Sequence, residues 1–359
     1  MIRSALPALL VSSALLCASC LSLWDPWLQN PSDGSVYQGD MAGQTDRGDM
    51  ATASCNPPQV NGNPPMLAPE NPAPISSALH GVWANSACDV WAVGDNGATI
   101  HWDGTAWTNR TGATSLTLTR LWAPDAQTLW AIGTDGGNSA AIFHWSGTGW
   151  VKDGPGIAAE ALNGIWGAGP GDIWTVAGTF SLTSTGKILH YDGTSWTVTP
   201  TDYSGQLPGL FGVWGRSAND VWAVGGNGVI LHWTGTGTWT TVRTQAFQAF
   251  REVWGGSSGP VWAAGSVGFP PMNRLLFKWD GSTWTDATTG PASTSYYAVW
   301  GTAPDNAWVV GASGTVIHWN GSSWSQVAGN TAATLFGAGG DAANHLFFVG
   351  DSGTVLRSK

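Results

Sequence analysis

Five histidines are the residues of this chain with the clearest capacity for chemistry, because imidazole can bind a metal ion or transfer a proton near neutral pH. Each one directly precedes a Trp or Tyr within a recurring phrase: His101, His144, His190, His232 and His318. With about one such residue per repeat, they fall on separate structural units. We therefore predict that each histidine packs inside its own unit, and we expect neither a metal site nor a cofactor.

Carboxylates could supply acid–base chemistry, and the chain has three glutamates: Glu70, Glu160 and Glu252. A glycosidase needs two carboxylates that face each other across a sugar, and no such pair stands out. Three aspartates recur at one position of the phrase, where we expect them to cap turns: Asp89, Asp172 and Asp220. There is no Gly-x-Ser-x-Gly elbow, phosphate-binding glycine loop or Cys/His metal spacing. The sequence therefore favours a protein that is not an enzyme.

These residues lie in a Trp- and Gly-rich sequence repeat, which is clearest at residues 210–239. The chain of 359 residues contains 25 Trp and 50 Gly. The seven copies of the repeat start near residues 79, 118, 162, 210, 250, 296 and 335. Successive copies are 39 to 48 residues apart, which is the repeat length of a four-stranded propeller blade.

Each copy contains four short apolar runs separated by Gly, Asn, Asp and Ser, the pattern of four strands joined by tight turns. Residues 79–359 are thus predicted to form an all-β, seven-bladed β-propeller of four-stranded antiparallel blades. Most of the tryptophans are expected in its core. The seventh copy ends after its third strand, so we expect part of residues 57–77 to supply the fourth.

The N-terminus predicts export. Residues 1–20 contain Arg3, an apolar run and Cys17-Ala-Ser-Cys20, the layout of a secretory signal. The box before Cys20 resembles that of bacterial lipoproteins, which predicts lipidation of Cys20 and an outer-membrane location. Cleavage and secretion is the alternative.

The segment that follows, residues 21–78, is rich in Pro, Gly and Asn and is predicted to be a disordered tether. Cys55 and Cys88 could form one disulfide between this tether and the first blade.

The charge of the chain narrows its partners. The net charge is −10, with only 13 Lys plus Arg and no basic cluster. Nucleic acid and anionic membrane surfaces both need clustered cations, so neither is expected. Any membrane attachment would come through the lipid, and a monomer is expected.

Residues 212–239 and 299–324 resemble the Trp/Gly-rich propeller repeats of secreted and surface lipoproteins in bacteria. They are more distantly similar to the Asp-box (BNR) repeats of sialidases, sortilin-like receptors and the photosystem II assembly factor family. The likeness covers residues 79–359 and implies a propeller. Only Asp-Gly-x-x-Trp of the Asp-box is kept, as at residues 192–196. Sialidase activity would also need three converging arginines, and the arginines here fall at scattered repeat positions.

A candidate ligand site emerges where the copies differ. The connections between second and third strands and between blades vary in length, and both kinds should lie on one face. Near the start of the first strand, equivalent positions carry His80, Thr119, Asn163, Phe211, Arg251, Tyr297 and Phe336, with Arg120 and Glu252 replacing a neighbouring Gly. In this hypothesis Phe211, Tyr297 and Phe336 stack on a ligand while His80, Asn163 and Arg251 donate hydrogen bonds.

The sequence thus predicts a non-enzymatic binding or scaffold protein of the cell envelope that recognises a protein partner. Two alternatives remain open: lectin-like binding of extracellular polysaccharide, and a glycoside hydrolase of the sialidase type.

Overall fold

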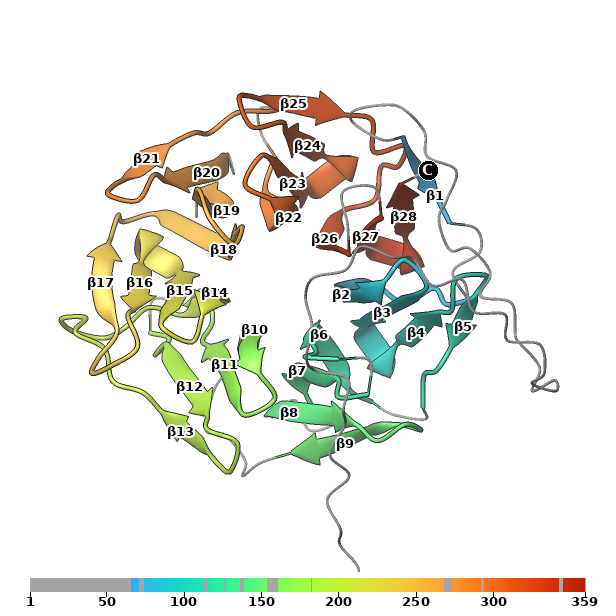
Figure 1. Cartoon of the computed structure of the whole chain (residues 1–359), viewed down its shortest axis with the longest axis horizontal. Helices are drawn as coiled ribbons and strands as arrows, with labels where there is room; N and C mark the ends of the chain where they lie inside the picture. The colour runs from blue at the N-terminus through green and yellow to red at the C-terminus, as the bar shows by residue number, and fades with distance from the viewer. Residues whose placement is uncertain are drawn as a thin grey trace, which may run out of the picture. The chain divides into compact units, whose positions relative to one another are not determined.

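Seven four-stranded antiparallel sheets make up the described part of the chain. The computed structural model describes residues 66–358 except 71–73, 113–114, 126, 136–138, 154–160, 182, 268–272, 292–293 and 342–344. The sheets follow one another around a ring, with the first strand of each blade nearest the centre (Figure 1). The predicted seven-bladed propeller is confirmed. No helix within these residues is long and apolar enough to cross a membrane.

The blades follow chain order from the inner to the outer strand. Blade 1 comprises β2 (Leu79–Ser86), β3 (Asp89–Gly94), β4 (Thr99–Trp102) and β5 (Trp107–Asn109). Blade 2 comprises β6 (Thr117–Trp122), β7 (Trp130–Thr134), β8 (Ala140–Trp145) and β9 (Trp150–Asp153). Blade 3 comprises β10 (Leu162–Gly169), β11 (Asp172–Ala177), β12 (Lys187–Tyr191) and β13 (Trp196–Val198). Blade 4 comprises β14 (Leu210–Ser217), β15 (Asp220–Gly225), β16 (Ile230–Trp233) and β17 (Thr240–Arg243).

Blade 5 comprises β18 (Gln248–Gly255), β19 (Val261–Val267), β20 (Arg274–Trp279) and β21 (Trp284–Asp286). Blade 6 comprises β22 (Tyr296–Ala303), β23 (Asn306–Gly311), β24 (Val316–Trp319) and β25 (Trp324–Val327). Blade 7 comprises β26 (Leu335–Gly340), β27 (Leu346–Gly350), β28 (Val355–Ser358) and β1 (Leu67–Pro69). Single 3-10 turns join the second and third strands in four blades: η1 (Asp95–Gly97), η2 (Gly226–Gly228), η3 (Ala312–Gly314) and η4 (Asp351–Gly353).

The last blade is closed by the N-terminal segment, as expected from the missing fourth strand. Strand β1 pairs antiparallel with β28, Leu67 opposite Ser358. The Leu67 side chain is only 1% exposed and joins a core cluster with Trp308 and Leu356. Asn330 donates from Nδ2 to the carbonyl of Leu67 at 2.6 Å. The ring is therefore closed by three residues, of which Leu67 also fills part of its core.

At five of the seven junctions between blades, a channel-side tryptophan lies over a glycine of the next blade. A Cβ placed on Gly215 of blade 4 would lie 2.5 Å from the ring of Trp166 in blade 3, and the same holds for Gly167 against Trp122. Glycine leaves room for the indole at these junctions, whereas between blades 1 and 2 the equivalent position is Ala123, which packs in the same cluster as Trp83. In blade 7 the tryptophan position is held by Gly339, and the next residue along the ring is Ala84 rather than glycine.

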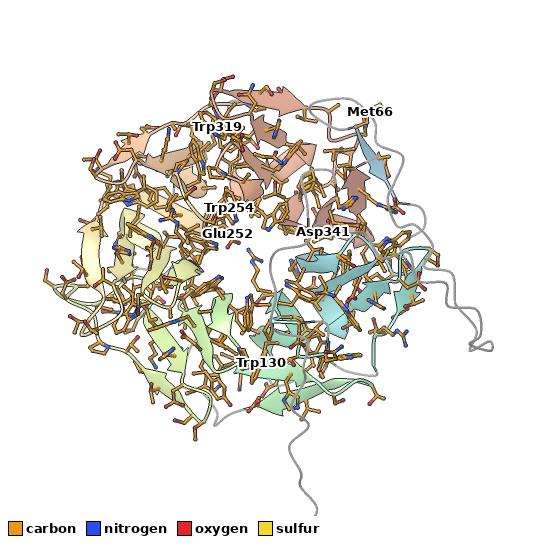
Figure 2. The ribbon with its side chains drawn as sticks, in the orientation of Figure 1. Met66, Trp130, Glu252, Trp254, Trp319 and Asp341 are labelled. Carbon is orange, nitrogen blue, oxygen red and sulfur yellow. The ribbon has the colours of Figure 1, made fainter. Side chains whose placement is uncertain are left out.

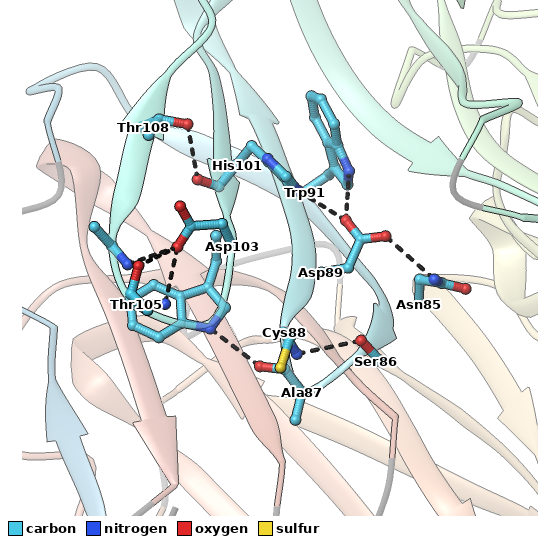
Figure 3. Close-up of polar contacts among 12 residues, drawn as sticks. Asn85, Ser86, Ala87, Cys88, Asp89, Trp91, His101, Asp103, Thr105 and Thr108 are labelled. Atoms are coloured by element: carbon cyan, nitrogen blue, oxygen red, sulfur yellow. Dashed lines mark hydrogen bonds and ion pairs between the residues drawn. The ribbon is translucent and has the colours of Figure 1, made fainter. Parts of the chain in front are cut away.

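Within the blades, the recurring aspartates have a role that the sequence analysis did not predict. Asp89 accepts hydrogen bonds from Nε1 of Trp91 at 3.0 Å and from Nε2 of His101 at 2.7 Å (Figure 3). The two rings stack, with centroids 4.2 Å apart. The predicted turn cap is thus wrong: the carboxylate holds a Trp–His stack in place across strands β3 and β4. The prediction that the histidines are bonded within their own blades is supported by equivalent contacts: His190 with Asp172, and His232 with Asp220.

Blade 6 carries an amide where these blades carry a carboxylate. Nε2 of His318 lies 2.7 Å from Oδ1 of Asn306, and its ring stacks on Trp308. The histidine is 3% exposed, and burial lowers its pKa to about 4. His318 is thus held neutral inside the blade.

Of the predicted N-terminal features, the structure describes one side of the disulfide. Cys88 is disulfide-bonded, and it lies in the turn between β2 and β3 (Figure 3). Its predicted partner Cys55, the lipidation site Cys20, the signal at 1–20 and most of the tether at 21–78 lie outside the described residues.

Candidate functional site

A β-bulge interrupts the first strand of every blade at the same place, where one residue is skipped in the pairing with the second strand. The skipped residues are the seven equivalent positions singled out in the sequence: His80, Thr119, Asn163, Phe211, Arg251, Tyr297 and Phe336. A bulge takes a residue out of the regular alternation of the strand and re-aims its side chain. One backbone irregularity therefore presents seven different side chains at one end of the channel.

These side chains gather around a single cavity of about 230 Å³, together with Arg120 and Phe180. The remaining predicted residue, Glu252, lines an adjoining cavity of about 240 Å³ that includes the channel tryptophans. His80 and Arg120 line both cavities. Figure 2 shows Glu252 and Trp254 beside the centre of the ring. The structure thus brings all nine predicted residues together at the mouth of the channel, while ligand binding by them stays a prediction.

Two aromatic groups form walls of the mouth cavity. On one side Phe180 stacks on Phe211 with centroids 3.9 Å apart. On the other, Phe336 contacts Tyr297 at 5.3 Å and His80 at 5.1 Å. The cavity therefore offers ring faces and edges to an apolar or aromatic group.

Arg251 lies between these two walls. Its guanidinium carbon is 4.6 Å from the ring centroid of Phe180 and 4.7 Å from that of Tyr297. Burial lowers the pKa of Arg251, and the nearby Arg120 lowers it further. Its Nε is buried without a hydrogen-bond partner among the described residues. Its guanidinium thus lies beside two aromatic rings rather than beside a carboxylate.

Arg120, in contrast, has a carboxyl partner. Its Nε lies 3.4 Å from Oε2 of Glu252, which joins blade 2 to blade 5 across the channel, and its Nη1 donates to the carbonyls of Thr119 and His80. Burial raises the pKa of Glu252 to about 7, although Arg120 acts in the opposite direction. The two side chains form a polar contact across the channel, next to the mouth cavity.

Two of the three expected hydrogen-bond donors already have protein partners. The amide of Asn163 donates from Nδ2 to the carbonyls of Gly178 and Leu210, at 2.7 and 2.8 Å. Nε2 of His80 lies 2.9 Å from Oδ1 of Asp95. The Nδ2 of Asn163 thus joins neighbouring blades, and Arg251 is the expected donor whose guanidinium remains available.

The sequence analysis missed Phe180, which lies in the lengthened connection between β11 and β12. It is 56% exposed and separates the mouth cavity from a groove of about 330 Å³. Phe247, 64% exposed, lines the same groove and has a φ of 64°. A bulky residue rarely adopts this left-handed conformation, and such strain is frequent at binding sites. The unusual length of the connection was the signal that could have led to Phe180.

Connections of two kinds meet on this face, as the sequence predicted. Gly226, which follows β15, donates its backbone N–H to the carbonyl of Gly209, which precedes β14. Ala312 and Ser295 make the same bond in blade 6. The groove is accordingly lined from both sides, by residues 179–181, 184 and 226–227 and by residues 206, 208–209 and 247–249.

The described residues that line the cavities include few groups that could act as a catalytic acid, base or metal ligand. Glu252 is the one carboxylate among the described residues that line the three cavities, and it is paired with Arg120. No cluster of three or more His, Cys, Asp or Glu suited to a metal occurs in the described part of the chain. The arrangement is suited to holding an apolar group beside an anion.

Similarity to known proteins is confined to the fold. No family model matches the sequence, and no curated protein matches it. Among solved structures, YCF48 bound to D1 peptide has a TM-score of 0.62 and 16% identity, over 86% of this chain and 99% of that one. YCF48 from Cyanidioschyzon merolae has a TM-score of 0.60 and 14% identity, over 82% and 98%. A streptogramin B lyase has a TM-score of 0.66 and 15% identity, over 82% and 97%.

The propeller is thus shared with a peptide-bound protein and with a lyase, at identities that carry no function across. The expected likeness to the photosystem II assembly factor family holds at the level of the fold.

Proposed function

We propose that this protein is a non-enzymatic binding module of the cell envelope that recognises a protein partner at the mouth of its channel. One observation carries the proposal: the seven bulged residues differ almost completely from blade to blade, yet they line one cavity. Repeats that are kept for packing alone have no need of a different side chain at every copy, whereas an asymmetric ligand does.

The neighbouring groove supports a protein partner over a compact small molecule. The mouth cavity is lined by all seven blades, the groove by blades 3, 4 and 5, and both are bordered by the aromatic ring of Phe180. Exposed aromatic rings beside a single cation are typical of protein recognition sites. YCF48 bound to D1 peptide supports the idea that a propeller of this kind can hold a peptide.

The proposed location follows from the sequence. Lipidation of Cys20 would anchor the chain in the outer membrane, with residues 21–78 as the tether. The propeller itself would then bind partners away from the lipid surface.

Photo-crosslinking in intact cells tests the proposal. A photoreactive residue at Phe180 should capture one defined envelope protein, and the capture should disappear when Tyr297→Ala is added. The same photoreactive residue at Val198, which is 61% exposed on the outer strand β13, is the control and should not capture that envelope protein. Tyr297-dependent binding on a glycan array without protein capture would instead establish the lectin alternative, and release of sugar would establish the hydrolase.

A further inference from the structure

Arg251 is a cation without an anion. Other cations of the propeller each have a carboxylate partner, which Arg251 lacks among the described residues. Arg120 pairs with Glu252, Arg216 with Asp220 at 2.9 Å, and Lys152 with Asp135 at 2.8 Å. In the described part of the chain Arg251 has neither a salt bridge nor a hydrogen bond to its buried Nε. A cation withdrawn from water normally acquires an anionic or hydrogen-bonding partner.

The two aromatic rings beside Arg251 stabilise its charge only in part. Ring faces attract a guanidinium, but they leave its N–H groups, which lie in the plane of the group, without acceptors. The two rings also restrict the guanidinium on both sides, at 4.6 and 4.7 Å, and so fix the direction of its donors. A fixed guanidinium fork matches a carboxylate, which can accept two parallel hydrogen bonds.

We infer that Arg251 binds a carboxylate of a peptide whose adjacent apolar side chain enters the groove between Phe180 and Phe247. The inference rests on the proposed function and specifies its ligand. Phe180 carries the argument, because its ring contacts the guanidinium of Arg251 and also lines the groove, so the two subsites are neighbours. The occupant is an extended peptide with an acidic group next to an aromatic or aliphatic residue.

The carboxylate is either an Asp or Glu side chain or the C-terminus of the partner, since both present the same two oxygens. A phosphate group is less well matched, because Arg120 is paired with Glu252, so that among the described residues of the mouth cavity Arg251 is the one arginine without a carboxyl partner. One guanidinium balances one carboxylate.

Peptide arrays probed with the full-length protein test the inference. Random dodecapeptides are attached at either end, with the free C-terminus as carboxylate on one array and as amide on another. We expect binding peptides to carry Asp or Glu, or the free carboxylate, beside an apolar residue. Changing that Asp to Asn should weaken binding about tenfold or more, the effect of losing a charge-assisted pair.

Substitution of Arg251 completes a double-mutant cycle. R251M should weaken binding of the acidic peptide to the same extent and should have little further effect on the Asn peptide. R216M removes the same charge from an arginine paired with Asp220, away from the mouth residues, and should bind as the wild type does. Melting of each variant is followed, and R251K is used in the same cycle if R251M fails to fold, with a smaller loss expected.

Equal binding of the acidic peptide to R251M and to the wild type would overturn the inference while leaving peptide recognition intact. Selection of basic or uncharged peptides would do the same. If no peptide binds on any array and no Tyr297-dependent crosslink forms in cells, the proposed function itself fails.

Discussion

Replacing Asn306 with aspartate should raise the pKa of His318 and make the propeller more resistant to acid. In the wild type, burial holds the pKa of His318 at about 4, against an ordinary value of 6.5. A difference of this size means that protonating the folded protein costs about 3 kcal/mol more than protonating the unfolded chain. The cost arises because the imidazole is 3% exposed and faces an amide oxygen rather than a carboxylate.

The sign of the effect follows from proton binding. Above pH 6.5 the histidine is neutral in both states and contributes nothing. As the pH falls from 6.5 to 4, the unfolded chain binds a proton that folded His318 does not, so the free energy of unfolding decreases, by up to about 3 kcal/mol. A carboxylate at position 306 would lie near Nε2, now 2.7 Å from Oδ1 of Asn306, and would stabilise the charged ring. Most of the decrease in the free energy of unfolding that His318 causes at acidic pH should then disappear.

Histidine NMR titration and urea unfolding at several pH values measure the two quantities. The His318 resonance is identified by its absence in His318→Gln. Titration of wild-type His318 near 6.5, or an unchanged titration in Asn306→Asp, would refute the reasoning.

Four further predictions concern the closure, the packing, the channel and the anchor. Leu67→Ala should lower the free energy of unfolding by about 2 kcal/mol or more, because it empties a site that is 1% exposed, whereas Met66→Ala, at 67% exposed, should have no effect in the same urea titration. Gly215→Ala should lower the free energy of unfolding by about 1–3 kcal/mol, because the added methyl group would clash with the ring of Trp166. Gly169→Ala, where a Cβ meets nothing within 4 Å, is the control. Equal melting temperatures of the two variants would contradict the proposed packing of Trp166 on Gly215. The pKa of Glu252 is raised to about 7, so its contribution to the free energy of unfolding is present below about pH 4.5 and is lost as the pH rises through 7. Glu252→Gln should therefore flatten the dependence of the unfolding free energy on pH in this range. An unchanged dependence would argue against this role of Glu252. Cys20→Ala should abolish incorporation of labelled fatty acid into the protein, and equal labelling of variant and wild type would exclude Cys20 as the acceptor.

Much of the fold could be predicted because the repeat exposes it. A repeat with Trp at a fixed distance from a Gly-containing turn in six copies, and Phe347 at the matching position of the seventh, specifies strand length, blade number and the strand missing from the last blade. The rim positions could be found in the same way, since aligned copies show directly where side chains differ. The bulge that aims them recurs in every blade, so its effect was visible in the alignment even though its geometry was not.

The contacts of individual side chains could not be predicted, because they join residues that are distant in sequence. Asp89 was expected to cap a turn, yet it bonds across two strands to His101. Asn163 lines the mouth cavity as expected, but the bond of its amide to a carbonyl of the next blade, 47 residues away, was not predicted. The pairing of Arg120 with Glu252 joins residues 132 positions apart, and only the closed ring brings them together.

The closing strand also sets the order of events in biosynthesis. Asn330 bonds to Leu67, 263 residues earlier in the chain, and β28 pairs with β1 only when the final residues are present. Contacts of such separation form slowly, because a long loop must be ordered first. Until synthesis reaches Val355–Ser358, strand β1 has no partner strand and the half-made ring exposes a sheet edge. Such an edge can pair with another chain, so closure of the ring also removes a route to aggregation.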